Sequence, residues 1–220
     1  MLDALEKAWS EVVDTARRTV AEGLVAGTSG NVSARVGDLV LVTPTGVPYD
    51  RLGPGDAVAV DLDGRQVRGT LRPTSELPTH LAVYRETPAR AIVHTHAPHA
   101  TAASTLVSKL PNIHYAAAGM GGQVLVADYA LYGSQELARA VLKALRDGRT
   151  ACLMRNHGTL AHGDTLGQAY ERTAQLEWMC RVWLLARSAN DTGSPRTLSN
   201  RELGRVAEKL KGYGQPDTAD

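Results

Sequence analysis

The sequence is poor in several residue types that mark particular protein classes. Phenylalanine is absent, there are two cysteines, and aromatic residues make up only 5% of the 220 residues. Cys152 and Cys180 lie far apart in apolar surroundings, so neither a zinc knuckle nor a dithiol redox motif is expected. We predict that both are small buried residues, and that Val, Leu and Ala fill most of the core.

The sequence also lacks an excess of charge and any long apolar run. A net charge of +1 is not the basic balance of a nucleic-acid-binding protein. No stretch approaches the roughly 18 to 20 apolar residues needed to cross a bilayer. The first residues, MLDALEKAWSEV, carry acidic groups where a signal peptide has a basic start and an apolar core. We therefore expect a cytoplasmic protein with no nucleic-acid or membrane partner.

What is present is the composition of a soluble globular protein. Hydrophobic residues make up 43% and charged residues 21%, and the 10 prolines and 21 glycines are not concentrated in a linker. A chain of this length supports one substantial core. We expect a single domain over residues 1–220, in which about 212–220 form a mobile C-terminal tail.

Hydrophobic periodicity predicts alternating helices and strands. Apolar residues at spacings of three and four predict a helix over 2–25 that Gly27 helps to end. Short strands at 32–36, 38–44 and 56–62 are typical of an antiparallel meander. Further helices are expected at 76–86, 98–108, 134–147, 164–190 and 201–211, and further strands at 91–96, 124–129 and 150–158. This alternation indicates an α/β or α+β fold in which helices cover a sheet.

The stretch IVHTHAPH contains two histidines, His94 and His96, on either side of one threonine. Side chains at i and i+2 of a strand lie on the same face, so the two rings could share one ion. His157 ends another apolar stretch, and Gly158 would let the backbone turn sharply beside it. Three imidazoles with an open fourth position match a catalytic zinc site. The spacing alone leaves open whether His157 joins the pair, and a single histidine is more often structural.

Three other stretches have the residue types of backbone anion sites. They are GTSGN at 27–31, TPTG at 43–46 and PTSE at 73–76. Small residues and hydroxyl groups at turns and helix starts can bind phosphate through their N–H groups. Ordinary turns and N-caps explain each stretch on its own, so the function of each stays open at this point.

Six motifs in this order and spacing resemble the class II aldolase and adducin head family. They are GTSGNVSAR at 27–35, TPTGVPYDRL at 43–52, PTSELPTH at 73–80, IVHTHAPH at 92–99, PNIHYA at 111–116 and RNHG at 155–158. The match extends from the first helix to Tyr213. It implies a three-layer α/β/α fold with a central, largely antiparallel sheet, and a homotetramer with active sites at subunit interfaces.

The resemblance also implies particular roles for residues of this chain. One Zn²⁺ per chain would be held by His94, His96 and His157, with Glu76 as the catalytic acid and base. Tyr115 from a neighbouring subunit would also act in catalysis. Tyr213, in the C-terminal tail, is implied as a further catalytic residue that acts in the reaction or closes the site. The residues implied to bind the substrate and its phosphate fall in the three anion-like stretches: Thr28, Gly30, Asn31, Thr45, Gly46, Thr74 and Ser75.

The implied reaction is the cleavage of a ketose 1-phosphate, such as L-fuculose 1-phosphate, into dihydroxyacetone phosphate and a short aldehyde. Zinc would stabilise the enediolate left by the broken C3–C4 bond. Tyr115 would take the proton of the C4 hydroxyl, and Glu76 would return a proton to the enediolate carbon. Burial would raise the pKa of Glu76 and the zinc charge would lower it, and the sequence leaves that balance open.

Other activities of the family stay open as alternatives. Sugar-phosphate 4-epimerases carry Asp at the position of Glu76, and they have an acidic residue that is missing from NIHYAAAG. Aldolases of 5-deoxypentulose 1-phosphates need the same residues and differ in the pocket for the aldehyde. A methylthioribulose-1-phosphate dehydratase and an oxo-tetronate phosphate decarboxylase are further relatives. An adducin-like scaffold lacks the metal ligands.

The remaining histidines are interpreted as structural. His99 lies close enough to the predicted site to support a ligand, whereas His114 and His162 have no such place. His80 follows Glu76 by one helical turn, so it is a plausible neighbour of the carboxylate, with packing as the preferred role. The apolar stripe that contains Trp178 is expected to serve the core or a subunit contact.

Overall fold

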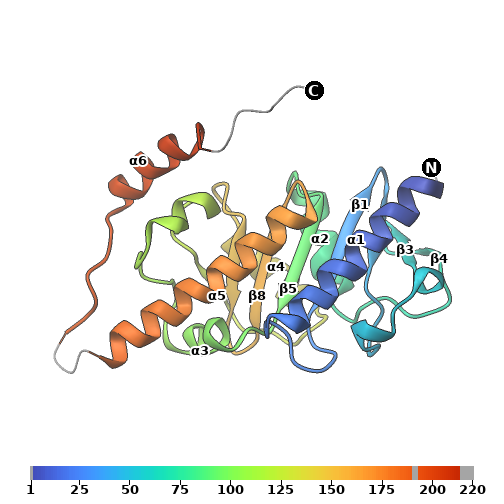
Figure 1. The fold of residues 1–220 in the computed structure, drawn as a ribbon, viewed down its shortest axis with the longest axis horizontal. Coiled ribbons are helices and arrows are strands. Elements are labelled where there is room, and N and C mark those ends of the chain that lie inside the picture. The colour runs from blue at the N-terminus through green and yellow to red at the C-terminus, as the bar shows by residue number, and fades with distance from the viewer. Residues whose placement is uncertain (1, 190–192, 214–220) are drawn as a thin grey trace.

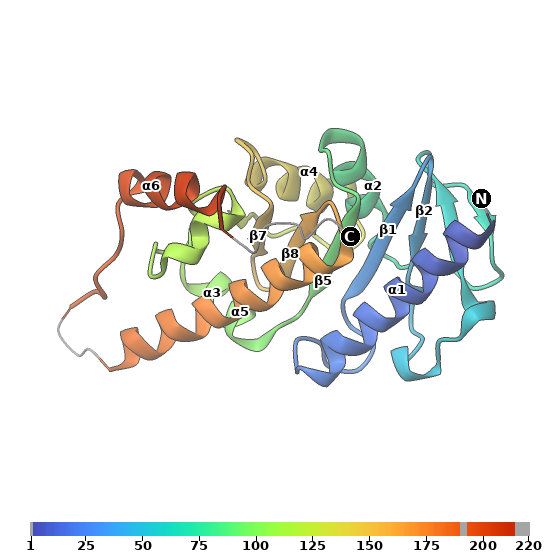
Figure 2. The same ribbon diagram turned by 45° about the horizontal axis from the view of Figure 1, so that its top comes forward.

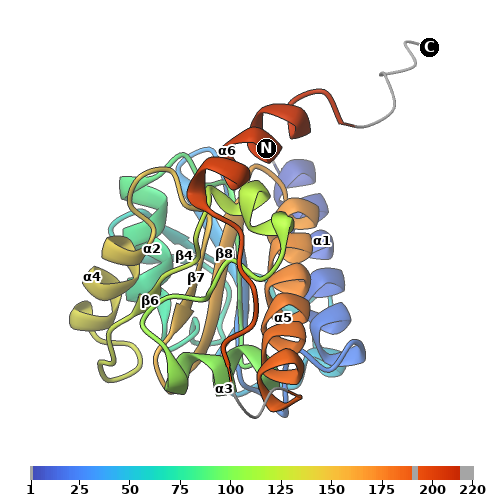
Figure 3. The same cartoon turned by 90° about the vertical axis from the view of Figure 1, so that its left-hand side faces the viewer.

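The computed structural model describes residues 2–189 and 193–213, whose strands form one eight-stranded sheet. The strand order is β4-β3-β2-β1-β5-β8-β7-β6. Every neighbouring pair is antiparallel except β6 and β7. Helices cover both faces of this sheet, as the end-on view in Figure 3 shows. The prediction of a three-layer α/β/α fold with a largely antiparallel sheet is confirmed.

The first half of the sheet is the predicted meander. Strands β1 (Asn31–Val36), β2 (Leu39–Val42) and β3 (Val58–Asp61) pair in sequence order, and β4 (Gln66–Arg68) adds the edge strand. The connection from β2 to β3 contains two 3-10 helices, η1 (Tyr49–Arg51) and η2 (Pro54–Asp56). These short connections keep sequential strands adjacent, which is the usual outcome for hairpin-linked strands.

The second half of the sheet contains a strand that the sequence did not predict. The additional strands are β5 (Ala91–Thr95), β6 (Val126–Ala127), β7 (Ala151–Met154) and β8 (Gly158–Gly163). The predicted strand at 150–158 is wrong beyond Met154, because the chain turns and returns as β8, antiparallel to β7. The sequence GTLAHG offers only two apolar positions between glycines, although every residue of it is buried. Burial on both faces removes the alternation by which a strand is recognised.

The helices divide into two layers. The layer that faces the viewer in Figure 1 contains α1 (Leu2–Ala21), α3 (Pro98–Leu106) and α5 (Leu166–Ser188). Figure 2 shows α1 and α5 crossing the strands side by side. The opposite layer contains α2 (Leu77–Glu86) and α4 (Gln135–Ala144), which pack against each other. No helix in 2–189 or 193–213 combines the length and the apolar character that a bilayer crossing requires.

The first helix ends four residues earlier than predicted. It stops at Ala21, and Gly23 adopts the left-handed conformation with φ of +71°. The Leu24 N–H donates to the Thr19 carbonyl over 2.8 Å, which closes the helix end in the manner of a Schellman motif. Leu24 continued the apolar periodicity of the sequence, but it is buried from the following loop.

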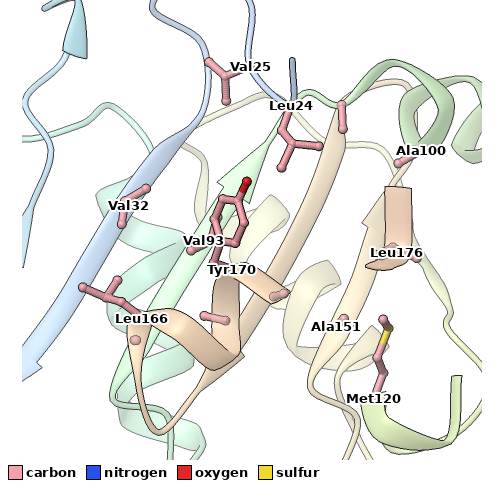
Figure 4. Close-up of a cluster of buried hydrophobic side chains, with 14 of the residues drawn as sticks. Leu24, Val25, Val32, Val93, Ala100, Met120, Ala151, Leu166, Tyr170 and Leu176 are labelled. Atoms are coloured by element: carbon pink, nitrogen blue, oxygen red, sulfur yellow. The ribbon is translucent and has the colours of Figure 1, made fainter. Parts of the chain in front are cut away.

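The core between α5 and the sheet is built mainly from aliphatic side chains. Figure 4 shows Leu166 and Tyr170 of α5 near Val32 and Val93 of the sheet. The two cysteines are free and buried, as predicted. Burial raises the pKa of the Cys152 thiol to about 12, so that this side chain is an inert thiol in the core.

The C-terminal helix packs against a 3-10 helix. Helix α6 (Asn200–Leu210) contacts η3 (Tyr115–Met120), and Leu203 is buried between them. Of the expected tail at 212–220, only Gly212 and Tyr213 belong to the described residues. The rest of that prediction lies outside the part of the chain that the structure describes.

Candidate active site

Three histidine rings converge at the carboxyl end of β5. His94 is the fourth residue of β5, His96 follows its end, and His157 lies in the turn from β7 to β8. The ring centroids are 4.8 to 4.9 Å apart in all three pairs, and the ring planes are steeply inclined to one another. The Nε2 atoms of His94 and His96 are 3.1 Å apart. The structure therefore places both rings of the i, i+2 pair on one side and brings His157 to them, a contact that the spacing in the sequence left open.

The orientation of His94 is fixed from behind by the backbone of β8. Its Nδ1 donates to the Thr159 carbonyl oxygen over 2.7 Å, because that oxygen can only accept. With Nδ1 as the donor, a neutral His94 ring would leave the lone pair of Nε2, which faces the other two histidines, free for a metal ion. A backbone carbonyl that holds the rear nitrogen is the usual support of a metal-binding histidine.

Glu76 faces the three rings from the start of α2. Its Oε2 lies 2.7 Å from Nε2 of His94 and accepts a hydrogen bond from Nδ2 of Asn31 over 3.0 Å. Its Oε1 is buried, lies 3.4 Å from Nε2 of His157 and has no hydrogen-bond partner among the described residues. One ligand atom from each of the four side chains lies within 4.8 Å of the others.

Electrostatics decide the protonation of this cluster. Burial raises the pKa of Glu76, but the charge and hydrogen bond of His94, with further help from His157 and Asn31, hold it well below its ordinary value. Burial lowers the pKa of His94, but Glu76 raises it more, so the net shift is upward. Burial and the positive charge of His94 lower the pKa of His96 to about 3 and that of His157 to about 4. The expected burial effect on Glu76 is present, but it is outweighed.

The chemistry of these groups fits a divalent cation. Imidazole nitrogens and a carboxylate oxygen suit Zn²⁺ and related first-row metals. Two observations support the fit: a buried carboxylate oxygen has no partner among the described residues, and Nε2 of His94 faces both Nε2 of His96 and Oε2 of Glu76, whereas one hydrogen on it can be directed to only one of them. Without a cation, the cluster depends on an ion pair between His94 and Glu76.

A cavity of about 370 Å³ opens beside the histidines. It is lined by Glu76, His96 and His157 and by all three anion-like stretches. Every residue that was predicted to bind the substrate or its phosphate is in the lining: Thr28, Gly30, Asn31, Thr45, Gly46, Thr74 and Ser75. The fold thus brings segments from residues 28 to 75 to the side of the metal-ligand cluster.

The cavity walls offer backbone N–H groups and a helix start. Thr74 and Ser75 precede α2, whose N-cap is Glu76, so the positive end of the helix dipole faces the cavity. Gly30 has φ of +78°, and a Cβ atom there would lie 2.8 Å from the His94 carbonyl oxygen. This close approach excludes any side chain at Gly30 and keeps its loop against the metal-ligand strand.

Tyr49 holds the same loop from the other side. Its hydroxyl donates to the Gly30 carbonyl over 2.7 Å, and burial raises the pKa of Tyr49 to about 12, so the hydroxyl stays a donor. The sequence showed Tyr49 only as part of a motif and gave it no role. Its position three residues after the turn glycine Gly46 is compatible with many functions, so the sequence offered no signal for this one.

The turn that presents His157 differs from the sequence interpretation. The residue with the left-handed backbone is Asn156, at φ of +54°, and not Gly158. Gly158 is required for another reason, because a Cβ atom there would lie 2.0 Å from the Thr95 carbonyl oxygen and 3.2 Å from Cα of His96. Asn tolerates the left-handed region better than most residues, so its place before His-Gly was an available signal.

The loop before α4 supplies cavity residues that the sequence analysis missed. Tyr129 and Tyr132 line the cavity together with the anion-like stretches and are each 64% exposed. Gly133, at the end of this loop, approaches Ser75 so closely that a Cβ atom would lie 2.5 Å from the Ser75 carbonyl oxygen. This contact joins two segments nearly sixty residues apart, which no local pattern could reveal.

The two predicted catalytic tyrosines are at the surface. Tyr115 is 53% exposed, its ring lies beside that of His114, and it is not among the described residues that line the cavity. Tyr213 is 85% exposed and is also outside that lining. Trp178 contacts His114 and is partly exposed, unlike the buried Met179 and Trp183 of the same stripe. An exposed aromatic group at α5 and η3 is thus formed by the rings of His114, Tyr115 and Trp178.

Two of the remaining histidines, His99 and His114, have structural partners. His99 pairs through Nδ1 with Glu177 of α5, whose two carboxylate oxygens also accept the N–H groups of His99 and Ala100 at the start of α3. His114 accepts the N–H of Ala116 and caps η3. His162 is buried on β8, and burial lowers its pKa.

Known proteins resemble this chain over most of its length. Residues 10–184 match the family described as the Class II Aldolase and Adducin N-terminal domain. An L-fuculose phosphate aldolase of Escherichia coli strain K12 is 38% identical over 206 residues, which cover 93% of this chain and 94% of that protein. A 5-deoxy-D-ribulose 1-phosphate aldolase of Bacillus thuringiensis serovar kurstaki is 34% identical over 214 residues, which cover 96% and 99%.

The solved structures include a similar fold. The structure of an L-fuculose 1-phosphate aldolase superimposes with a TM-score of 0.88 at 34% sequence identity, and the match covers 93% of this chain and 96% of that one. The likeness therefore extends to the three-dimensional arrangement of the elements that form the candidate site.

Proposed function

The chain belongs to the Class II Aldolase and Adducin N-terminal domain family, and on that premise we propose that it is a zinc-dependent aldolase of ketose 1-phosphates. Its products would be dihydroxyacetone phosphate and a short aldehyde. The observation that carries the proposal is the junction of two features. A cluster of three imidazoles and one carboxylate opens on a cavity that a helix start and glycine turns make suitable for a phosphate.

The proposed metal site and the proposed phosphate site would bind different parts of the substrate. His94, His96 and His157 would hold the Zn²⁺, which when bound supplies Lewis-acid stabilisation of the negative charge that develops on the ketose oxygens. The N–H groups at the start of α2 and the loops of Gly30 and Gly46 would bind the phosphate. Holding the phosphate and the ketose oxygens at the same time would fix the C3–C4 bond relative to the catalytic groups, so that proton transfer occurs within one complex.

Glu76 is placed to move a proton. It lies in the cavity lining, and Oε2 is held by His94 and Asn31 while Oε1 is free of hydrogen bonds to the described residues. Because its pKa is lowered, the carboxyl group is ionised before substrate binds. It must therefore collect a proton from the substrate or from solvent before it delivers one to carbon.

Tyr115 and Tyr213 are proposed to act on the cavity of a neighbouring subunit in a homotetramer. Both rings are exposed on their own protomer, and neither lines its own cavity. A phenolic hydroxyl that enters from outside could relay the C4 hydroxyl proton, accepting it while passing its own hydrogen to solvent, and could close the aldehyde end against water. Tyr115 has the aromatic neighbours His114 and Trp178, which would be covered by such a contact.

The aldehyde end decides which ketose 1-phosphate is cleaved. We propose an L-fuculose 1-phosphate-like substrate, on the 38% identity to the Escherichia coli protein. A 5-deoxypentulose 1-phosphate is the second candidate, on the near-complete match to the Bacillus thuringiensis protein. Tyr129 and Tyr132 at the cavity wall would contact the part in which these substrates differ.

A substrate panel tests the proposal. The metal-free protein, with and without added Zn²⁺, is given several ketose 1-phosphates, and the release of dihydroxyacetone phosphate is followed with a coupled dehydrogenase. We expect release only with metal and with about one Zn²⁺ bound per chain. His94→Ala should abolish both metal binding and release, because removing one of three ligands opens the site.

The alternatives give different results in the same assay. A 4-epimerase would return an epimerised sugar phosphate without free dihydroxyacetone phosphate. A scaffold protein would remain folded without metal and would cleave none of the substrates. Either result with correctly folded protein would contradict the aldolase proposal.

A further inference from the structure

Behind Glu76, four buried polar side chains form a continuous hydrogen-bonded chain. Glu76 Oε2 contacts Nδ2 of Asn31 at 3.0 Å, and the Oδ1 of Asn31 is hydrogen-bonded to Nε2 of His80. Nδ1 of His80 lies 2.7 Å from Oγ of Ser33, which lies 2.7 Å from the hydroxyl of Tyr84. All five residues are buried, and His80 and Ser33 are completely inaccessible.

The chain arises where α2 packs on the sheet. Asn31 and Ser33 are two residues apart on β1, so their side chains share one face. Glu76, His80 and Tyr84 are four residues apart at the start of and along α2, so they form one row that faces β1. Figure 3 shows α2 in the layer on this side of the sheet. The two rows interdigitate, and each helix residue meets a strand residue.

The chemistry of the end groups determines the direction of every bond. An ionised carboxylate only accepts, so Asn31 must donate its amide N–H to Glu76 and present its oxygen to His80. That oxygen only accepts, so Nε2 of His80 must carry the proton. In the neutral ring Nδ1 is then an acceptor, and it receives the hydrogen of Ser33, whose oxygen accepts from Tyr84. All four donors in the chain therefore point toward Glu76.

We propose that His80, in its Nε2–H tautomer, is a positioning residue that holds the amide of Asn31 and through it the carboxylate of Glu76. Without the donor at Nε2, the amide of Asn31 is free to rotate and present its oxygen to the carboxylate, which repels it. The effect on turnover depends on the proposed aldolase function, whereas the tautomer is a property of the folded chain alone.

The surroundings of His80 keep its ring neutral, as this arrangement requires. Burial lowers the pKa of His80 to about 3, with the charge of His94 lowering it further and that of Glu76 opposing. A protonated ring would carry a hydrogen at Nδ1, so that the Ser33 hydroxyl would have to accept this hydrogen bond instead of donating it. The buried site therefore excludes the form that would break the direction of the chain.

Asn31 connects this chain to the cavity. Its side chain directs one N–H to Glu76, and the residue also lines the cavity beside Gly30. The amide nitrogen carries a second hydrogen, which is available to a bound anion. An amide fixed by His80 would thus hold both the carboxylate and part of the predicted phosphate site in register.

The first experiment reads the tautomer directly, on metal-free and substrate-free protein. The protein is labelled with nitrogen-15 histidine, and two-dimensional NMR spectra correlate the ring nitrogens with the carbon-bound ring protons. The signals that disappear in His80→Gln are those of His80. We expect a neutral ring with the proton on Nε2 and a bare Nδ1 at neutral pH. A proton on Nδ1, or on both nitrogens, would overturn the proposed direction of the chain.

The second experiment separates positioning from packing. His80→Leu removes the donor, and we expect kcat to fall about 10- to 100-fold with KM changed less than threefold, the scale of losses when the support of a site residue is removed. His80→Gln places an amide N–H near the position of Nε2 and should regain most of kcat. Equal loss in both folded variants, or full activity in His80→Leu, would overturn the inference.

Two further variants serve as controls for this experiment. Thr79→Val removes a buried hydroxyl from the neighbouring residue of α2, one that has no hydrogen-bond partner among the described residues, and it should leave kcat unchanged. Ser33→Ala is a smaller change in the chain and covers the case in which His80→Leu does not fold. Its kcat should fall in the same direction, and an unchanged value would contradict the chain. If no variant or wild type cleaves any substrate, the aldolase proposal fails while the tautomer result stands.

Discussion

Glu76 is the residue at which the metal-ligand cluster, the cavity and the buried hydrogen-bonded chain meet. Its two oxygens have different surroundings, since Oε2 is held by His94 and Asn31 and Oε1 has no hydrogen-bond partner within the described residues. In the proposed mechanism, such asymmetry would let one oxygen fix the group while the other transfers a proton. The lowered pKa of Glu76 reflects the cationic neighbour and outweighs the effect of burial.

The role of Glu76 leads to a prediction for the isosteric amide. Glu76→Gln should keep the metal content of the wild type, because the three histidines are untouched. It should lower kcat about 10²- to 10⁴-fold, because an amide cannot exchange a proton with the substrate. Steady-state kinetics and metal analysis on the same preparation check this. Glu86→Gln, at the exposed end of the same helix, is the matched control, and retention of full activity by Glu76→Gln would remove the residue from the mechanism.

His80 also gives a prediction about stability and pH. Its pKa is about 3 in the fold and about 6.5 in an unfolded chain, so only the unfolded state takes up the proton as the pH falls through that window. The free energy of unfolding should therefore fall by about 2 kcal/mol more in the wild type than in His80→Gln between pH 7 and pH 5. Urea unfolding of both proteins, with a metal chelator present, measures this difference in the free energy of unfolding. Parallel pH curves for the two proteins would contradict a neutral His80.

At the scale of the elements, the site depends on how closely β8 approaches β5. Gly158 opens β8 directly after His157, and its missing side chain lets the backbone pass the end of β5 where His96 lies. Asn156 in the left-handed region makes the turn that aims His157 at the other two rings. The metal-ligand geometry is thus a property of the strand pair and of its turn together.

Gly158→Ala tests this dependence. The added methyl group would meet the Thr95 carbonyl oxygen at 2.0 Å, so the strands must separate. We expect a loss of about 1 to 3 kcal/mol in the free energy of unfolding and weaker Zn²⁺ binding. Urea unfolding and a metal-competition titration measure the two effects. Gly204→Ala in α6, where a Cβ atom meets nothing within 4 Å, should be neutral or stabilising. Unchanged zinc affinity in Gly158→Ala would argue against strand spacing as its cause.

At the scale of the whole molecule, the cavity lies beside the proposed metal ligands and is lined by the proposed phosphate loops, and neither predicted catalytic tyrosine is among the described residues that line it. Tyr115 and Tyr213 are exposed on the side that α6 and η3 form. The proposed assembly would place each tyrosine at the cavity of another protomer. Exposed aromatic groups of this kind are typical of protein interfaces.

Mixing two inactive variants tests a shared site. Tyr115→Phe and Glu76→Gln chains should each be slow alone, and unfolding and refolding them together should partly restore turnover, because some cavities then combine an intact Glu76 with an intact Tyr115. Activity of the refolded mixture against each variant refolded alone is the measurement. No restoration in a mixture shown to contain hybrid oligomers would indicate a site that is complete within one chain.

The sequence by itself determined most of the elements and the metal-ligand candidates. The i, i+2 spacing of His94 and His96 fixes their shared face because strand geometry has a period of two. Three-and-four spacing located the helices. It made the predicted first helix too long, because the buried Leu24 keeps the same apolar spacing although it lies in the loop after Ala21. Such features are local, so a linear pattern records them.

Only the tertiary structure decided what lies beside what. The strand β8, the contact of Gly133 with Ser75, and the chain from Tyr84 through His80 to Glu76 join segments that are distant in sequence. These contacts follow from the packing of α2 on β1 and from the return of the chain at Asn156. Since long-range contacts depend on the order and register of strands, which no short segment encodes, the surroundings that tune Glu76 could be found only in the folded chain.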